Sequence, residues 1–507
     1  MLARNGRLLF AALVVVVLAG LYAVAGPHHP AAAGYAAVAP ARAPVTTAVQ
    51  ACAAPGSAGV AAGSLAITAV PGSSAPGSAQ ISRLVPGGSP AAGPALTTDS
   101  RPDLTQLLTV HAAVALPKSL LAGQQGSTSA VTTFTGRGGV AVTASGSMAQ
   151  GLAVDQVSAG GLVTAQCGSP GTSFWFVGPG QMLTHTIELY LMNTDDVTAN
   201  AQVTAVTDVT KNGPILSNAD NGIEVPPHSM VVQSLTGLLQ SSKVVAVDVS
   251  TSVGRVVASL RESTSSSDTG TWLPASQAPS RHLVISGLPS TGRTPDLYIA
   301  VPGTGSSLVK VTAVTAKGSY QPTGGTGIDL LGQTAIAIPL PSLAGVGGAV
   351  RISASSPVTA TMLVSGGPAG SAGALVASGA PLQQQAILAD APAGSAGSTD
   401  LVLTAPGRAA SVRVVVGTTT EPVTGQTGTV VQIKAGSSIV VPVRPPAGHH
   451  RGTALMVVVS PLAGSGPVYG AWSVSAAGAI RSILPLVSAQ TWIPLPAVHV
   501  GITDVAP

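Results

Sequence analysis

The sequence contains few charged side chains. Lys, Arg, Asp and Glu together make up 8% of its 507 residues, against about 25% in an ordinary soluble domain. Coiled coils and helical bundles need Glu, Lys and Arg in quantity, so this shortage excludes them. The 61 glycines lack the three-residue period of collagen. Because 45% of the residues are hydrophobic, charge-driven disorder of the whole chain is excluded as well.

Aromatic residues and basic clusters are also scarce. Phe, Trp and Tyr make up 3% of the chain, and no run of Lys or Arg occurs although the formal net charge is +4. Nucleic-acid-binding proteins place aromatic rings against bases and clustered cations against phosphates. We therefore expect no nucleic-acid partner.

The usual catalytic and cofactor motifs are missing. The sequence contains no G-x-S-x-G, Walker A, G-x-G-x-x-G or H-E-x-x-H pattern. Asp and Glu together number 18, which leaves little material for a catalytic carboxylate pair. We predict that the chain is not an enzyme and that it has no cofactor and no metal. An unfamiliar site assembled from distant loops stays open, because such a site leaves no linear motif.

The N-terminus predicts export. Arg4 and Arg7 precede residues 8–25, a stretch without any charged side chain. As a helix, this stretch would span about 27 Å, close to the roughly 30 Å of a bilayer core. We favour a retained single-pass anchor in the cell membrane, with the C-terminal bulk outside the cytoplasm. Ala23-Val24-Ala25 also fits a signal-peptidase site, so secretion after cleavage is the alternative.

Two cysteines, Cys52 and Cys167, lie in the exported part. In an oxidising compartment an isolated pair normally forms a disulfide. This disulfide would bracket an N-terminal domain of its own. Two free buried thiols are the alternative, and a metal site is excluded because neither cysteine has Cys or His at ligand spacing.

Short runs rich in Val, Ile and Thr alternate with clusters of Gly, Pro, Ser and Asn, which is typical of β-sandwiches. Blocks beginning at Glu188, Asp296 and Asp400 repeat at about 105 residues, the size of one immunoglobulin-like sandwich. The pentapeptide VTAVT occurs at 203–207 and again at 311–315. We therefore predict an all-β protein of tandem immunoglobulin-like β-sandwich domains behind a single N-terminal transmembrane helix.

The repeat sets the expected domain boundaries. Trp272-Leu273-Pro274, near the end of one block, returns as Trp492-Ile493-Pro494 near the end of the last. We expect an anchor or signal sequence at 1–25, a linker at 26–45, an N-terminal β domain with a low-complexity loop at 46–170, and sandwich repeats at 171–290, 291–395 and 396–500.

Phe174, Trp175 and Phe176 bring three of the rare aromatic residues together. On a strand, Phe174 and Phe176 share one face and Trp175 takes the other. We favour a structural role in a seam between domains. The alternative is a platform that contacts a ligand, such as a sugar, or a protein partner.

Two polar clusters are candidate metal ligands. Asp195 and Asp196 follow a predicted strand and could bind calcium through carboxylate oxygens. We favour a simple turn, in which Asp and Asn side chains bind their own backbone. His449 and His450 lie in a Pro- and Gly-rich segment, where we favour a solvated loop over a metal site.

Several segments resemble a known family: CGSPGTSFWFV at 167–177, ELYLMNTDD at 188–196, GRVVASLRES at 254–263 and TWLPAS at 271–276. They are similar to a family of actinobacterial exported proteins that is known only as a domain of unknown function. The resemblance covers roughly residues 50–500. It implies an envelope protein encoded among cell-wall and glycan-assembly genes, with no assigned catalytic or binding residues.

Two functions are compatible with these patterns. We favour a non-enzymatic, membrane-tethered extracytoplasmic protein that acts as a structural or interaction module of the cell envelope. The alternative is a carbohydrate-binding accessory protein in cell-wall glycan assembly. The expected partners are the membrane, through residues 8–25, and cell-wall glycan or other envelope proteins.

Overall fold

The computed structural model consists of β-strands in most of the residues that it describes, and the predicted all-β class is confirmed. These residues are 15–16, 42–53, 63–69, 77–86, 109–110, 128–134, 139–157, 163–180, 185–208, 215–217, 222–236, 238–239, 242–264, 267–290, 294–364, 373–392, 397–418, 428–446 and 455–495. No helix in this described part is long and apolar enough to cross a bilayer. The predicted membrane segment, residues 8–25, lies outside the described residues except for Val15 and Val16.

The chain divides into two compact units. One unit comprises residues 1–43 and 493–507, and the other comprises residues 44–492. β1 (Arg42–Pro44) and β35 (Trp492–Pro494) form a two-stranded sheet. The strands from β2 to β34 all belong to the second unit, where they form four consecutive groups.

The first group packs two sheets around a small core. Leu65 and Ile67 from one sheet meet Val140 and Val142 from the other. One sheet has the order β4-β7-β2, and the other has the order β6-β3-β8-β9. The strands are β2 (Thr47–Cys52), β3 (Gly63–Ala69), β4 (Gly77–Pro86), β5 (Thr109–Val110), β6 (Thr128–Phe134), β7 (Gly139–Gly146), β8 (Ala153–Val157) and β9 (Val163–Gln166), with a short 3-10 helix η2 (Ser147–Ala149) after β7.

The second group is also built from two sheets. In β12, Val203 and Ala205 point into the core while Gln202 is exposed, as the period of two along a strand requires. One sheet has the order β10-β16-β12-β13, and the other runs β18-β17-β11-β15 and continues into β4 of the first group. The strands are β10 (Ser173–Pro179), β11 (His185–Asn193), β12 (Ala199–Thr207), β13 (Ile215–Ser217), β14 (Ile223–Val225), β15 (Ser229–Ser234), β16 (Val244–Val253), β17 (Val257–Thr264) and β18 (Ser267–Leu273).

The third group is organised around one long strand. The first part of β25 pairs with β19 and β21, and its last part pairs with β20 and β26. The strands are β19 (Ser280–Leu288), β20 (Asp296–Val301), β21 (Ser307–Thr315), β22 (Gly318–Tyr320), β23 (Ile328–Leu330), β24 (Thr334–Pro339), β25 (Gly348–Val364) and β26 (Ala374–Ala377), with a 3-10 helix η3 (Pro341–Leu343) before β25.

The fourth group consists of two four-stranded sheets, with the orders β27-β32-β29-β30 and β31-β28-β33-β34. Trp472, which is fully buried, lies in the core between them. The strands are β27 (Ala386–Ala391), β28 (Ser398–Ala405), β29 (Ala410–Thr418), β30 (Thr429–Ile433), β31 (Ser437–Pro442), β32 (Leu455–Pro461), β33 (Tyr469–Ala476) and β34 (Ala479–Pro485).

The internal repeat of the sequence corresponds to a recurring pattern of strand pairing. β11, β20 and β28 each lie between two antiparallel neighbours, which are β15 and β17, β24 and β25, and β31 and β33. β12, β21 and β29 likewise pair with β14 and β16, β23 and β25, and β30 and β32. The second, third and fourth groups therefore share one arrangement, while the exact domain boundaries stay a prediction.

Neighbouring groups are joined by hydrogen bonds. β15 of the second group pairs in parallel with β4 of the first. The hydroxyls of Ser276 and Thr361 lie 3.0 Å apart between the second and third groups. Ser438 Oγ of the fourth group donates to the carbonyl oxygen of Val314 in the third, at 2.8 Å. Each group is thus fixed to the next one along the chain.

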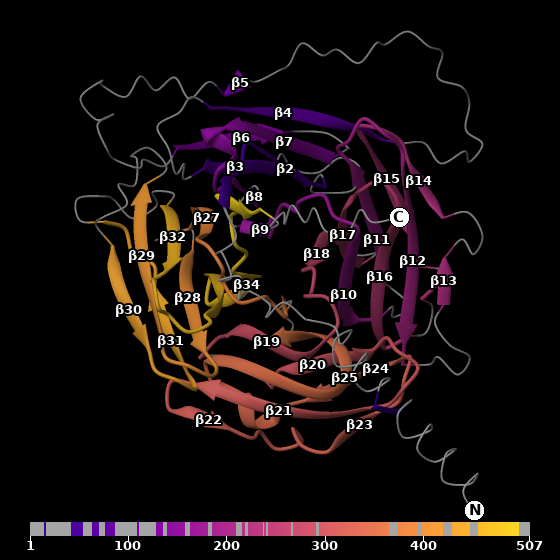
Figure 1. Ribbon diagram of the computed structural model, residues 1–507, viewed down its shortest axis with the longest axis vertical. Helices are drawn as coiled ribbons and strands as arrows, with labels where there is room; N and C mark the ends of the chain where they lie inside the picture. The colour runs from indigo at the N-terminus through magenta and orange to yellow at the C-terminus, as the bar shows by residue number, and fades with distance from the viewer. Residues whose placement is uncertain are drawn as a thin grey trace, which may run out of the picture. The chain divides into compact units, whose positions relative to one another are not determined.

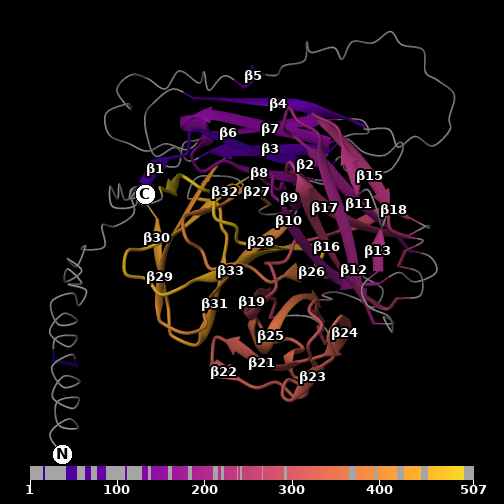
Figure 2. The same cartoon turned by 45° about the vertical axis from the view of Figure 1, so that its right-hand side comes forward.

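The fourth group also contacts the first. Ala153 packs with Ile387 and Ala489 in a shared apolar cluster, and the backbone N–H of Ala389 binds the carboxyl group of Asp155. Figures 1 and 2 show β27 close to β3 and β8, although these strands are far apart in the sequence. The fourth group therefore contacts the first group as well as the third.

Candidate functional site

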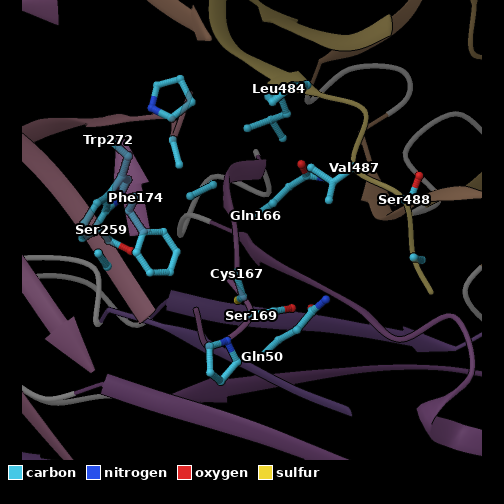
Figure 3. Close-up of a pocket in the computed structure, with 18 of the residues that line it drawn as sticks. Gln50, Gln166, Cys167, Ser169, Phe174, Ser259, Trp272, Leu484, Val487 and Ser488 are labelled. Carbon is cyan, nitrogen blue, oxygen red and sulfur yellow. The ribbon is translucent and has the colours of Figure 1, made fainter. Parts of the chain in front are cut away.

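A cavity of about 900 Å³ lies within the unit of residues 44–492, and all four groups contribute to its lining. In Figure 3, Trp272 and Phe174 lie on one side of the cavity, Val487 and Ser488 lie on the opposite side, and Gln50 lies below them. The lining comes from β2 and residues 165–170 of the first group, β10, β17 and residues 271–275 of the second, residues 374–375 of the third, and residues 481–485 and 487–490 of the fourth. Ligand sites in proteins are commonly hollows of this size at the meeting of several elements.

A disulfide fixes one wall of the cavity. Cys52 and Cys167 are joined with their Cα atoms 4.8 Å apart, so the predicted disulfide is present. Beside it, the backbones of Ala51 and Gly168 exchange two hydrogen bonds of 2.8 and 3.0 Å. This cross-link connects β2 to the segment after β9 and thereby holds Gln50 in the cavity wall.

Trp272 gives the cavity an aromatic face. Its ring packs against Tyr190 at a centroid distance of 5.3 Å, and the Arg261 guanidinium carbon lies 5.9 Å from its centroid. Burial raises the pKa of Tyr190 to about 12, and the hydrogen bond from its hydroxyl to Glu188 adds to this rise. The indole N–H of Trp272 makes no hydrogen bond to another described residue.

The predicted aromatic run is divided between the two faces of β10. Phe174 and Phe176 both line the cavity, and Phe176 also belongs to the core of the second group. Trp175 takes the opposite face, and its carbonyl oxygen accepts the N–H of Ser276 at 2.7 Å. The three rings therefore do not offer one common surface.

The charged side chains that line the cavity are both arginines. Among the described residues that form its wall there is no Asp, Glu, Lys or His. Arg255 makes a two-pronged ion pair with Asp195, with N···O distances of 3.0 and 2.9 Å, and this contact raises the pKa of the guanidinium. Arg481 makes no ion pair with any described residue. The lining as a whole carries positive charge.

Side-chain amides add hydrogen-bonding groups. Gln50 Nε2 donates to the carbonyl oxygen of Leu152 at 3.2 Å, while its buried Oε1 has no hydrogen-bond partner among the described residues. Gln166 and Gln490 also line the cavity. Gln50 Oε1 is closed to solvent, whereas Gln490 is an exposed lining residue whose amide can reach a bound molecule.

An ionisable side chain lies beside this wall. Asp155 pairs with Gln166 across the β8–β9 ladder and is 1% exposed. Burial raises the pKa of Asp155 to about 7, and the charge of Asp390 adds to the rise. The N–H of Ala389 and the side chain of Gln166 act in the opposite direction. Burial also raises the pKa of Asp390. This acidic pair lies where the first and fourth groups meet.

The predicted calcium candidates are engaged in other contacts. Asp195 pairs with Arg255, and Asp196 Oδ1 lies 2.7 Å from His228 Nε2. Asn193 Oδ1 accepts the N–H of Asp195 at 2.9 Å, which is the turn geometry that the sequence favoured. No cluster of three metal-binding side chains occurs within the part of the chain that the structure describes. The predicted loop with His449 and His450 lies outside the described residues.

Most of the cavity residues carry no signal in the sequence. Gln50, Gln166 and Arg481 come from distant segments, and nothing in their local sequence points to a shared wall. Trp272 is the exception, because the motif Trp272-Leu273-Pro274 recurs near the end of the chain. The repeat therefore marked this tryptophan as a structural position but did not identify it as a site residue.

Residues 121–444 match the model of a family of unknown function, DUF5719. This match covers more than half of the chain. The chain belongs to the DUF5719 family. No curated protein matches it. The family match begins after residues 45–50 and ends before residues 481–490, so two parts of the cavity lining lie outside the matched part of this DUF5719 member.

Proposed function

We propose that this DUF5719 member is a non-enzymatic binding protein of the cell envelope and that the cavity is its binding site. The lining carries the proposal, because it combines an aromatic ring, amides and guanidinium groups in one hollow. Among the described lining residues there is no carboxylate or imidazole for acid–base catalysis. The sulfur of Cys167 is held in a disulfide and is therefore no nucleophile.

The proposed location is the outer side of the cell membrane, with residues 8–25 as the anchor. Two observations support it. Residues 8–25 contain no charged side chain and follow Arg4 and Arg7, and the chain contains a disulfide. Disulfides persist in exported proteins and are rare in the cytosol. The resemblance to exported actinobacterial proteins points in the same direction.

We also propose that the second, third and fourth groups are immunoglobulin-like sandwiches. In the second and fourth groups two sheets enclose one apolar core, and the same strand pairing recurs in all three groups. Their spacing of about 105 residues is that of a single such sandwich. In this arrangement the sandwiches act as a frame that positions the cavity wall.

A topology reporter tests the location. Alkaline phosphatase, which is active only outside the cytoplasm, is fused to the C-terminus of the full chain and of a variant without residues 8–25. We expect phosphatase activity in the membrane fraction for the full chain and none for the variant. If the intact mass corresponds to a chain that starts at Gly26, residues 1–25 are a cleaved signal sequence and not a retained anchor. An inactive fusion in the cytosol would overturn the proposal.

A more specific function is carbohydrate binding in cell-wall glycan assembly. The position of Trp272 favours it, because sugar rings stack their C–H faces on aromatic rings while amides such as that of Gln490 bind hydroxyl groups. This function would make the protein an accessory that holds a glycan rather than one that modifies it.

Binding to cell-wall glycan, measured by pulldown and glycan array, tests this function. We expect Trp272→Leu to weaken binding by about tenfold or more and Trp272→Phe to retain most of it. Trp175→Leu is the matched control, since Trp175 lies off the cavity. Equal binding by the native protein and Trp272→Leu, or no binding by the native protein, would exclude carbohydrate binding here and leave the topology result intact.

A further inference from the structure

The cavity holds one positive charge that no described residue neutralises. Both lining arginines bear a charge, but that of Arg255 is paired with Asp195 at 2.9 and 3.0 Å. Arg481 extends from β34, is exposed, and forms no ion pair within the described part of the chain. A guanidinium in a hollow without carboxylates attracts an anionic group and can bind a carboxylate or phosphate through two N–H groups.

The same cavity also offers hydrogen-bonding groups and an aromatic ring to the uncharged, hydroxyl-bearing part of a ligand. The amide of Gln490, an exposed residue of the lining, offers both a donor and an acceptor, and the indole N–H of Trp272 makes no hydrogen bond to another described residue. The aromatic side chain of Trp272 also lines the cavity, on the same side as Phe174. These three features are complementary to donor hydroxyls, acceptor oxygens and an apolar C–H face, which occur together on a sugar ring.

We propose that the cavity binds an acidic sugar, whose carboxylate or phosphate is held by Arg481 and whose ring lies against Trp272. This inference rests on the proposed binding function and narrows it to one ligand class. A neutral sugar would make no use of the charge of Arg481, and a simple anion would make no use of the ring of Trp272 or the amide of Gln490. Together, Arg481, Trp272 and Gln490 favour a ligand that carries both a negative charge and a sugar ring.

Calorimetric titration of the purified full chain tests the proposal with three probes. Digalacturonic acid carries the acidic groups, α-1,4-galactobiose is its neutral counterpart, and inorganic phosphate is an anion without a sugar. The variants are Arg481→Gln, which removes the charge, and Arg481→Lys, which keeps it. Arg408→Gln is the matched control, because Arg408 is an exposed arginine outside the cavity lining.

We expect the native protein to bind digalacturonic acid at least about tenfold more tightly than the neutral disaccharide, which is the range of one charged hydrogen bond. Arg481→Gln should remove this preference, while Arg481→Lys should keep most of it and Arg408→Gln should keep all of it. Unchanged circular dichroism shows that each variant is folded.

Three results would overturn the proposal. Equal affinity for the acidic and the neutral disaccharide would leave carbohydrate binding standing but remove the role of Arg481. Phosphate binding as tightly as digalacturonic acid would reduce the cavity to an anion site. Absence of binding by both disaccharides would overturn the inference, while the pulldown and the topology reporter decide the proposed function independently.

Discussion

The backbone N–H of Ala389 donates a 2.6 Å hydrogen bond to Oδ2 of Asp155, although the two residues are 234 positions apart in the sequence. Asp155 lies on β8 in the first group, and Ala389 lies on β27 in the fourth. The bond is buried and directly joins the groups at the two ends of the 44–492 unit. The carboxyl group that holds this contact is also the one whose pKa is raised to about 7.

This raised pKa makes the stability of the protein depend on pH. The pKa of Asp155 is 3.8 without the fold and about 7 within it. Below about pH 4 the carboxyl is protonated in both the folded and the unfolded state, so it does not lower the free energy of unfolding. As the pH rises towards about 7, the unfolded chain loses the proton first, so the free energy of unfolding falls. A pKa shift of this size lowers the free energy of unfolding by an amount on the order of 4 kcal/mol. This loss is complete once the pH is above the pKa of the folded state.

Asp155→Asn should remove the part of this pH dependence that comes from Asp155. The asparagine oxygen can still accept the N–H of Ala389, but the side chain no longer ionises. Between about pH 5 and about pH 8 we expect the denaturant midpoint to fall clearly less in the variant than in the native protein, and the variant to be the more stable at the higher pH. Asp329→Asn, at an exposed position, is the control. Parallel pH profiles for the native protein and Asp155→Asn would contradict the argument.

The contact between Asp155 and Ala389 also shows where sequence-based prediction stops. The alternation of buried Val203 and Ala205 with exposed Gln202 is visible in the sequence, because strand period is a local property. The disulfide was predictable because the chain has only two cysteines. A hydrogen bond between residues 234 positions apart has no local signal, since it depends on how the groups pack.

The same reasoning explains why the cavity was not predicted. Gln50, Trp272 and Arg481 belong to three different groups and meet only when those groups are assembled. The aromatic run at 174–176 was conspicuous in composition, but strand geometry sends Trp175 away from the cavity. Composition therefore predicted which residues were unusual and left open which of them share a wall.

The disulfide should be a major contributor to stability. Cys52 and Cys167 are separated by 115 residues, and closing a loop of this length lowers the free energy of the folded state relative to the unfolded one by about 4–5 kcal/mol in the chain-entropy model. We expect the free energy of unfolding of the double variant Cys52→Ser/Cys167→Ser, measured in urea, to be lower than that of the native protein by an amount of this order. Reductant should shift the native protein towards the variant and leave the variant unchanged. A native midpoint that does not respond to complete reduction would argue against this role.

Gly287 is required where the third and fourth groups touch. It has a φ of +105°, and an added Cβ would lie 2.7 Å from both Ala471 Cβ and Ile483 Cγ2. Gly287→Ala therefore combines backbone strain with steric overlap between the added Cβ and its neighbours. We expect it to lower the free energy of unfolding by about 2–4 kcal/mol. Gly318 has a similar φ of +113° but nothing within 4 Å of an added Cβ. Gly318→Ala measures the strain alone, and equal losses of thermal stability in the two variants would show that the overlap at Gly287 relaxes.

Trp472 supports the core of the fourth group and lies outside the cavity lining. Its side chain is 0% exposed, and its indole N–H is buried without a hydrogen-bond partner among the described residues. Trp472→Ala should leave a large void and cost about 3–5 kcal/mol. Trp472→Phe removes the unpaired donor along with part of the ring, and these opposite effects should hold the loss to about 1 kcal/mol.

Chemical unfolding followed by circular dichroism distinguishes these two contributions of Trp472. If the unpaired indole N–H is as costly as its burial implies, Trp472→Phe should be far closer to the native protein than to Trp472→Ala. Trp175→Phe, at a half-buried position on β10, shows what the same ring replacement costs outside a core. A loss in Trp472→Phe as large as that in Trp472→Ala would mean that the ring volume alone decides the stability of this core.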